Sequence, residues 1–418
     1  MAMTKAAVSP RLRPLERAAG APFQLGRRAS LGVSAGVVAH TLWTSAAPAM
    51  VYRLYAQDWH LSHTVTAGIF AIYPIVVVAV LISFGGISDH IGRRAAMLMG
   101  LGASLAGTLL FAVAPSVIWL FLSRALMGIG VGLTAGPSTA AVLEFTGGGP
   151  SKRAALIIAV AQAGGFALAL LLGGALVQYA PWPTRLSFWV LAALLALLFT
   201  AAWFLPPHAG TNGGNAWRPR APSVPREVRP AFTLSALAMM TAYTHGVLVL
   251  SLGGQVAHDL VGTPNAFVGG AVLSLFAIVF GGTGLIARSL PARIAMITGA
   301  FVSTISMALL PLAVARHALP IFLLATSTAG AGYSLLFVSG LEVINAAAPA
   351  DRRGGVLSAL YFLSYLSMGA TAVVLGAVAT ARGLGLAIDL GAGVIAFLSL
   401  STLLLAASGR GLKRAAFP

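Results

Sequence analysis

The chain has 418 residues, of which 58% are hydrophobic and only 8% are charged, and its mean hydropathy is +0.91. An ordinary soluble domain is about half apolar and about a quarter charged, so the composition excludes a protein that buries its apolar surface by folding in water and indicates a membrane protein. The formal net charge is +17, but the basic residues form short clusters between apolar runs, which favours a membrane surface over nucleic acid as their partner. The absence of cysteine excludes disulfides, thiolate catalysis and cysteine-ligated metals.

Residues 1–28 are predicted to form a basic N-terminal tail, because arginines and prolines are interspersed there and no cleavage pattern of a secretory signal precedes the first apolar run. A membrane-spanning helix needs about 20 mainly apolar residues. Of the windows that fit, those at 29–50 and 232–253 are the more polar ones. We therefore expect an all-α membrane protein with twelve transmembrane helices, at 29–50, 64–87, 95–114, 117–143, 154–179, 186–205, 232–253, 266–287, 294–314, 319–345, 355–380 and 386–407.

The distribution of basic residues supports this count, since the cytoplasmic loops of membrane proteins are enriched in Lys and Arg. The two tails and every second loop together hold 21 of the 26 Lys and Arg residues, the other loops hold four, and Arg124 lies inside a helix. An even number of helices also places both termini on one side. We expect a multi-pass protein of a bacterial inner membrane with both termini in the cytoplasm.

A polar segment at residues 206–231, rich in Pro, Gly and Arg, is predicted to be a cytoplasmic linker. It separates an N-terminal six-helix bundle at 29–205 from a C-terminal six-helix bundle at 232–408, and residues 409–418 form a C-terminal tail. With a shift of 199 residues, the segment 85–100 overlays the segment 284–299, and Arg94 meets Arg293. Such an internal repeat is typical of transporters that bind their substrate between the two halves.

The turn between the second and third predicted helices concentrates charge in a chain that has little of it. Gly85 is small enough for a neighbouring helix to approach, and Gly92 can take the positive φ that a tight turn needs. Asp89 can pair with a basic residue, while Arg93 and Arg94 lie at the depth of the lipid headgroups. The spacing alone fits a plain positively charged turn as well as a functional one.

The sequence of this turn, "GGISDHIGRR" (85–94), resembles the signature of the loop between helices 2 and 3 in the major facilitator superfamily. The segment "RALMGIGVG", which begins at Arg124, is similar to the arginine-and-glycine motif of helix 4 in that family, with Met127 where many members have Gln. The resemblance implies two rocking bundles that expose a site alternately to each side, and a cytoplasmic gate that includes Asp89 and its neighbouring arginines. Ala169 and Leu170 stand where antiporters of the family often have Gly-Pro, which weakens the assignment as a drug/proton antiporter without removing it.

Two acids lie at the predicted cytoplasmic ends of helices and are each followed by a basic residue. Glu144 precedes Arg153, and Glu342 precedes Arg352. We expect these acids to pair with those arginines or with the arginines of the gate, as part of the same conformational switch.

Polar side chains inside membrane helices are costly and usually face the interior of the bundle. Arg124 lies about 10 Å deep at 1.5 Å per residue and has no acid in the middle of the neighbouring helices, so it either meets an anionic substrate or a proton site, or bonds backbone carbonyls. His40 and His245 either carry protons or are neutral with satisfied hydrogen bonds. Further candidates for the substrate or proton pathway, chosen because helices 1, 4, 7 and 10 line the cavity in the similar family or because their side chains are polar, are Trp43, Thr44, Gln162, Tyr243, Tyr333, Tyr361 and Tyr365.

The sequence thus predicts a secondary transporter that exchanges protons for a drug-like compound or metabolite and exports it. One alternative is import of a small organic anion bound by Arg124. Another is a membrane enzyme or a polytopic membrane protein without transport activity. No cofactor is expected, since the sequence shows no metal-ligand cluster, phosphate-binding loop or nucleophile triad. The expected partners are a small-molecule substrate, protons and the lipid bilayer, and a monomer is the default state of the similar family.

Overall fold

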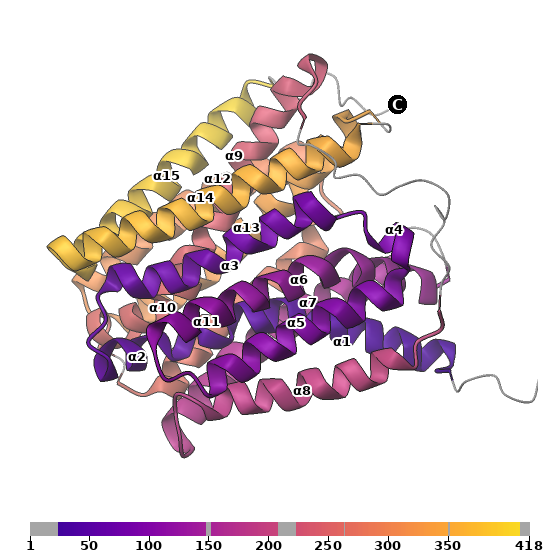
Figure 1. The fold of residues 1–418 in the computed structure, drawn as a ribbon. Helices are drawn as coiled ribbons and strands as arrows, with labels where there is room; N and C mark the ends of the chain where they lie inside the picture. Colours follow the sequence, from indigo (N-terminus) through magenta and orange to yellow (C-terminus); the bar gives the residue numbers. More distant parts are fainter. Residues whose placement is uncertain (1–23, 148–151, 208–222, 263, 350–351, 410–418) are drawn as a thin grey trace, which may run out of the picture.

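A computed structural model describes residues 24–147, 152–207, 223–262, 264–349 and 352–409, and Figure 1 shows its fold. The described residues form helices and no strand, which confirms the predicted all-α class. The long helices are α1 (Arg27–Ala46), α3 (His63–Phe84), α5 (Arg93–Ala112), α6 (Val117–Phe145), α7 (Lys152–Tyr179), α8 (Leu186–Trp203), α9 (Arg229–Val247), α11 (Ala266–Ala287), α12 (Ala292–Ala315), α13 (Leu319–Ala347), α14 (Arg353–Arg382) and α15 (Leu384–Ala407). The short ones are η1 (Ala47–Met50), α2 (Tyr52–Asp58), α4 (Ser88–Ile91), η2 (Arg226–Val228), η3 (Leu248–Leu252), α10 (Gly253–Gln255) and η4 (Val256–Leu260).

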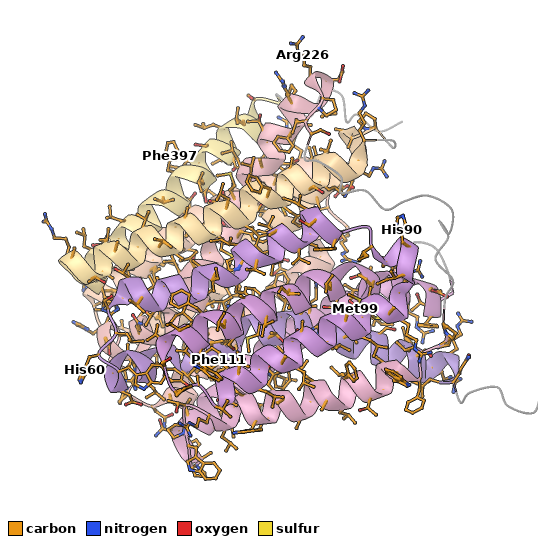
Figure 2. All side chains as sticks on the ribbon, in the orientation of Figure 1. His60, His90, Met99, Phe111, Arg226 and Phe397 are labelled. Atoms are coloured by element: carbon orange, nitrogen blue, oxygen red, sulfur yellow. The ribbon has the colours of Figure 1, made fainter. Side chains whose placement is uncertain are left out.

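Eleven of the described helical segments are long and apolar enough to cross a membrane. The remaining long helix, α1, does not reach this apolarity because it carries polar residues such as His40, Thr41 and Thr44. These residues are buried against other helices, so the polar content of α1 faces protein and not lipid. Large apolar side chains cover the outside instead; Phe397, which projects from α15 in Figure 2, is 70% exposed.

The helices run between two ends of the molecule, which we call the tail end and the far end. The tail end is the one at which the described chain begins and ends. At the tail end, α1 begins and α15 ends, and α4 with His90 lies there too (Figures 1 and 2). At the far end, α3 begins and α14 ends, and His60 marks it in Figure 2.

The long helices pack as two groups. In the first group, α5 packs against α6 and α8, α1 packs against α6 and α7, and α3 packs against α6. In the second group, α12 packs against α13 and α15, α9 packs against α13 and α14, and α11 packs against α13. Two long contacts join the groups: α7 lies along α11, and α3 lies along α14 (Figure 1).

A glycine contact recurs in the two groups and shows that their helices pack in the same way. In the first group, a Cβ on Gly130 of α6 would collide with the hydroxyl of Ser104 on α5. In the second group, a Cβ on Gly332 of α13 would collide with the hydroxyl of Ser303 on α12. The glycines therefore allow both helix pairs to approach closely, and Ser104 corresponds to Ser303 in the two groups.

The seventh long helix is longer and less regular than its apolar window predicted. After α9 ends at Val247, the helix continues through the π-helical segment η3, the short α10 and a second π-helical segment, η4, to Leu260. A π turn accommodates an extra residue, and such turns often occur at functional sites. The prediction stopped at 253 because polar residues, among them Gln255, His258 and Asp259, interrupt the apolar run there.

Candidate functional site

A cavity of about 520 Å³ lies between the two groups of helices. It extends from the middle of the molecule toward the tail end, where Leu81 near the end of α3 and Leu143 near the end of α6 line it. The described residues that line it include no Asp, Glu, Lys, Arg or His: they are Thr41, Leu42, Ser45, Tyr73, Leu81, Val131, Ala135, Gly136, Thr139, Ala140, Leu143, Gln162, Phe166, Tyr243, Gly246, Leu250, Phe276, Phe280, Tyr333, Phe337, Tyr361, Tyr365 and Met368.

The second group supplies an aromatic wall of this cavity. Tyr243 on α9 meets Tyr365 on α14 edge to face, with 4.7 Å between ring centroids. Tyr333 on α13 meets Phe280 on α11 edge to face at 5.2 Å, and it stacks on Phe337 at 6.0 Å. Such rings offer large apolar faces with a few hydroxyl groups at their edges. The wall is therefore suited to flat, apolar compounds that carry few hydrogen-bonding groups.

The first group supplies a wall of smaller side chains. Along α6, Val131, Ala135, Gly136, Thr139 and Ala140 face the cavity. These short side chains leave the volume that a bound compound needs. Drug-sized ligands are usually held in cavities of about 300–1,000 Å³ with mainly apolar walls and a few polar groups, and this cavity has both properties.

The structure brings together half of the side chains predicted for the substrate or proton pathway. Gln162, Tyr243, Tyr333, Tyr361 and Tyr365 line the cavity, although they come from four helices. The cavity does not include Trp43, Thr44, Arg124, His40 or His245 among its described lining residues.

Several aromatic lining residues escaped the sequence analysis, because an aromatic side chain in an apolar helix carries no signal of its own. The repeat between the two groups relates two of these missed residues, Tyr73 and Phe276, to each other. Gly128 on α6 packs against the backbone of Tyr73, and Gly330 on α13 packs against the backbone of Phe276. Overlaying α6 on α13 thus pairs Tyr73 with Phe276. The others were Phe166, Phe280 and Phe337.

Arg124 lies behind the cavity wall and is 0% exposed. Its guanidinium carbon is 4.3 Å from the centroid of the Tyr73 ring, and Tyr73 lines the cavity. Nη1 donates a hydrogen bond to the carbonyl oxygen of Thr44 at 3.2 Å, while Nε and Nη2 have no partner among the described residues. The ring face of Tyr73 offsets part of the cost of burying this charge. Tyr73 thus contacts both the cavity and Arg124, while Arg124 is not among the described lining residues.

The two predicted histidines differ in how their ring nitrogens are bonded. In His40, Nδ1 lies 2.7 Å from the carbonyl oxygen of Val37, and Nε2 lies 3.2 Å from the hydroxyl of Ser104. In His245, Nδ1 lies 2.8 Å from the carbonyl oxygen of Thr241, but Nε2 is buried with no partner among the described residues. A carbonyl oxygen only accepts, so Nδ1 carries the proton in both rings, and the neutral Nε2 is an acceptor.

The far end is closed by contacts between the two groups. His63 Nδ1 of α3 is hydrogen-bonded to Gln255 Oε1 of α10 at 2.9 Å. The Thr64 hydroxyl of α3 lies 2.9 Å from the Thr380 hydroxyl of α14. Asn265, whose side chain caps the start of α11, donates from Nδ2 to the hydroxyl of Tyr179 at the end of α7 at 3.4 Å.

Close backbone packing reinforces this closure. On α7, a Cβ at Gly174 would lie 2.6 Å from the carbonyl oxygen of Ala266, and Gln178 accepts from the amide of Ala266 at 2.8 Å. On α14, a Cβ at Gly376 would lie 2.8 Å from the carbonyl oxygen of His63. The two groups therefore meet at the far end, while the cavity between them extends toward the tail end.

At the tail end, the turn from Gly85 to Arg94 joins α3 to α5 through α4. Gly92 has a φ of 88°, which confirms the positive φ predicted for it. The expected close approach of a neighbouring helix at Gly85 is wrong: a Cβ there would meet the carbonyl oxygen of Leu81, one turn earlier in α3. The side chain of Asp89 lies outside the described part of the chain, so its place in a gate stays a prediction.

The arginines of this turn have partners at the tail end. Arg93 forms an ion pair with Glu144 at the end of α6, and Arg94 lies over the Trp203 ring with 5.8 Å between its guanidinium carbon and the ring centroid. Glu144 thus meets the arginine of the turn.

Of the other residues predicted for the gate, Arg153 and Arg352 are exposed. Glu342 is partly buried and forms no ion pair with a described residue. The structure therefore joins one of the two acids to the turn and leaves the other apart from it.

The family model described as Major Facilitator Superfamily matches residues 33–372. The chain is 32% identical over 168 residues to the multidrug efflux pump LfrA of Mycolicibacterium smegmatis, which covers 40% of this chain and 33% of that protein. It is 34% identical over 145 residues to the puromycin resistance protein pur8 of Streptomyces alboniger, which covers 34% of this chain and 28% of that protein. The matches span about a third of the length of these curated relatives.

Solved structures share the arrangement of the helices. A crystal structure of a POT family transporter in complex with 5-aminolevulinic acid superposes with a TM-score of 0.72 at 14% identity, covering 90% of this chain and 96% of that one. A peptide transporter POT, solved as a mutant, also gives a TM-score of 0.72, at 17% identity, and covers 92% of this chain and 96% of that one. At such low identity the likeness concerns the fold alone.

Proposed function

Since this chain belongs to the Major Facilitator Superfamily, we propose that it exports an apolar, aromatic compound across a bacterial inner membrane in exchange for protons. The matched family and relatives are transporters, so the chain is a multi-pass membrane transporter of small molecules and not an enzyme. The compound, the direction and the coupling to protons are the proposal.

The observation that carries the proposal is the neutral, aromatic lining of the cavity of about 520 Å³. An organic anion would leave its charge unpaired, because the described lining holds no cation, and leaving even a neutral buried group unpaired costs about 1–3 kcal/mol. A flat apolar compound loses little on entering and gains from ring contacts with Tyr243, Tyr333 and Tyr365. The printed descriptions of two relatives, a multidrug efflux pump and a puromycin resistance protein, agree with this class of compound.

Export also fits the side on which the cavity lies. Most Lys and Arg residues fall in the tails and in the loops at the tail end, and basic loops face the cytoplasm. With both termini in the cytoplasm, the cavity extends toward the cytoplasm and can take up a compound there. In the next step the first group, residues 29–205, rocks against the second, residues 232–408. The far end opens and the tail end closes.

We assign the conformational switch at the tail end to the ion pair between Arg93 and Glu144 and to the turn that carries Arg93. The ion pair joins α5 to α6, and both helices belong to the first group. It therefore holds the turn in place against its own group, and the closing of the tail end brings this turn toward the second group. We take the protein to be a monomer, with the complete cavity formed by one chain.

A second candidate function is transport of a small organic anion, and Arg124 favours it. Two of its donor nitrogens, Nε and Nη2, have no described partner. That edge of a guanidinium fits a carboxylate with two parallel hydrogen bonds. Against this candidate stands the described lining of the cavity, which includes Tyr73 and does not include Arg124.

Thermal unfolding of the purified protein in detergent, with the wild type, Arg124→Ala and Tyr333→Ala side by side, separates the two candidates. A ligand at a hundredfold excess over its Kd stabilises the folded state by about 2.7 kcal/mol. We expect apolar aromatic compounds to raise the Tm of the wild type and of Arg124→Ala equally, and to raise the Tm of Tyr333→Ala less. If organic anions raise the Tm of the wild type but not that of Arg124→Ala, the second candidate, a transporter of organic anions, is established instead.

Transport itself is measured in vesicles that contain the purified protein and an imposed pH gradient. A compound selected by the unfolding assay should move against its own gradient when the pH gradient is present, and only down it when the gradient is collapsed. Transport at the same rate with and without the pH gradient would refute proton coupling. If the compound does not cross the membrane in either condition, transport of that compound is refuted.

A further inference from the structure

A second, smaller cavity lies inside the second group of helices, at His245. Its volume is about 30 Å³, and its lining comes from α9, α11, α12, α13 and α15 together with η3, α10 and η4. The polar side chains of the lining are those of His245, Ser306 and Thr326. A cavity needs roughly 10–15 Å³ of such volume to hold a water molecule, so this one has room for at least one.

The cavity corresponds to the place that Arg124 fills in the first group. The recurring contact of Gly130 with Ser104 and of Gly332 with Ser303 aligns α6 with α13. The same alignment puts Thr326 where the first group has Arg124. In the first group a long guanidinium side chain occupies the space between the helices, and in the second group a short threonine leaves it open. The void is therefore a consequence of the sequence at one position.

The bonding of the two buried histidines differs between the groups. His40 is bonded to Ser104 through Nε2. In the second group, His245 Nε2 is buried and has no partner among the described residues, and neither has Oγ of Ser303, the residue that corresponds to Ser104. The first group thus satisfies its histidine completely, while the second group leaves an acceptor nitrogen unused.

The described residues that line the small cavity include no group besides His245 that takes up a proton in the ordinary pH range. The lining from α11, α12, α13 and α15 is apolar apart from Ser306 and Thr326. Tyr333 on α13 and Tyr365 on α14 line the large cavity instead. Asp389 on α15 is exposed, next to the lining residue Ile388. Among the described lining residues, a proton that enters this cavity has the Nε2 lone pair of His245 as its one basic site.

We propose that Nε2 of His245 is the atom that binds the transported proton, and that the small cavity is its entrance from the far end. This inference rests on the proposed proton-coupled export. A hydronium ion in the cavity gives its proton to the Nε2 lone pair, which leaves water and an imidazolium ring whose Nδ1–H still donates to Thr241. The new Nε2–H faces a cavity with the hydroxyl oxygens of Ser306 and Thr326 as acceptors. Loss of the same proton restores the neutral ring.

The position of the cavity separates the path of the proton from that of the substrate. Leu310 near the end of α12 and Phe322 near the start of α13 line it, and both lie in the far half of their helices. The large cavity extends toward the tail end. Proton and substrate thus approach α9 from opposite ends and on opposite faces, since His245 faces the small cavity while Tyr243 and Gly246 face the large one. A charge on His245 acts on the same turn of helix that holds the substrate.

The two histidines provide a matched pair of variants, His245→Gln and His40→Gln, each of which replaces a buried imidazole by an uncharged side chain. In vesicles, His245→Gln should keep exchange of substrate for substrate, which needs no net proton movement, and lose accumulation driven by a pH gradient at least tenfold. In His40→Gln, the ratio of gradient-driven accumulation to substrate exchange should stay as it is in the wild type. Gradient-driven accumulation that survives in His245→Gln, or is lost equally in both variants, would overturn the proposal.

Protonation is also measured directly, so that failure of the proposed function is told apart from failure of this inference. Nitrogen NMR of protein labelled at histidine, with each variant used to assign its missing signal, reports the charge of each ring. We expect the His245 ring to become charged when the pH is lowered, and the His40 ring to stay neutral over the same range. A His245 ring that stays neutral throughout refutes the proton site even if the protein exports its substrate. A ring that titrates in a protein without gradient-driven transport refutes the proposed coupling and retains the site.

Discussion

Joining Thr64 to Thr380 should hold the far end closed and stop transport. The hydroxyl oxygens of these residues lie 2.9 Å apart, one on α3 of the first group and one on α14 of the second. An S–S bond is about 2.04 Å long, so the sulfur atoms of Thr64→Cys/Thr380→Cys must come about 0.9 Å closer than the oxygens are. The longer carbon–sulfur bonds take up much of this difference. Because the protein has no cysteine of its own, the introduced pair is the only one that can form.

The contacts that close the far end are hydrogen bonds worth roughly 1 kcal/mol each, so thermal motion opens them, whereas a covalent bond does not open. Each oxidised molecule leaves the transport cycle, and the initial rate of transport should fall in proportion to the fraction that remains competent. Oxidation of nine molecules in ten lowers the rate about tenfold, and a reductant restores it. The single variants Thr64→Cys and Thr380→Cys should respond to neither treatment.

The assay compares the oxidised fraction, from a gel shift with a thiol reagent, with transport in the same vesicles. If the pair is oxidised almost completely and transport continues at the rate of the reduced protein, the far end need not open during transport. Alternating access between the two groups, as described here, would then be wrong.

Three further substitutions test other parts of the structure. Arg124→Met removes a buried charge with two unpaired donors and should raise the stability by about 1–4 kcal/mol, seen as a higher Tm; a lower Tm would show that the charge is satisfied. Glu144→Gln removes the ion pair with Arg93, and because both side chains are partly exposed, the free energy of unfolding should fall by no more than about 1 kcal/mol; a larger fall in chemical denaturation would point to a buried network. Gly174→Leu places a Cβ 2.6 Å from the carbonyl oxygen of Ala266 and should push α7 off α11. Thiol reagents should then label a cysteine introduced at the far end faster than they label the same cysteine in a protein that keeps Gly174. An unchanged labelling rate would show that this contact is not needed for closure.

The positions of the helices could be predicted because the membrane fixes the length of an apolar segment. The window 266–287 coincides with α11, and the window 117–143 falls two residues short of α6. The window 29–50 was predicted as one of the two more polar ones, and α1 is the long helix that does not reach the apolarity of the other spans. The irregular end of the seventh helix was missed, because the π-helical segments leave no signal in the sequence and polar residues interrupt the apolar run there.

The direction in which a side chain faces could not be predicted in the same way. Successive residues of a helix point about 100° apart, so a small error in the orientation of a helix turns a lining residue into a packing residue. Tyr243 and His245 show the effect: both were predicted for the pathway, and they lie in different cavities on two faces of one helix. Arg124 is a second case, because it was predicted for the pathway but is fully buried, with its guanidinium over the ring of Tyr73 from another helix.

The neutral walls of the large cavity determine how much electrical work a transport cycle does. The described lining carries no ionised side chain, so the walls move no charge of their own when the cavity changes the side that it faces. The membrane potential then acts on the cargo and the proton alone, at about 2.3 kcal/mol per charge and 100 mV. Exchange of an uncharged compound for one proton carries a current, and exchange of a monovalent cation for one proton carries none. The current through a transporting membrane thereby reports the charge of the cargo.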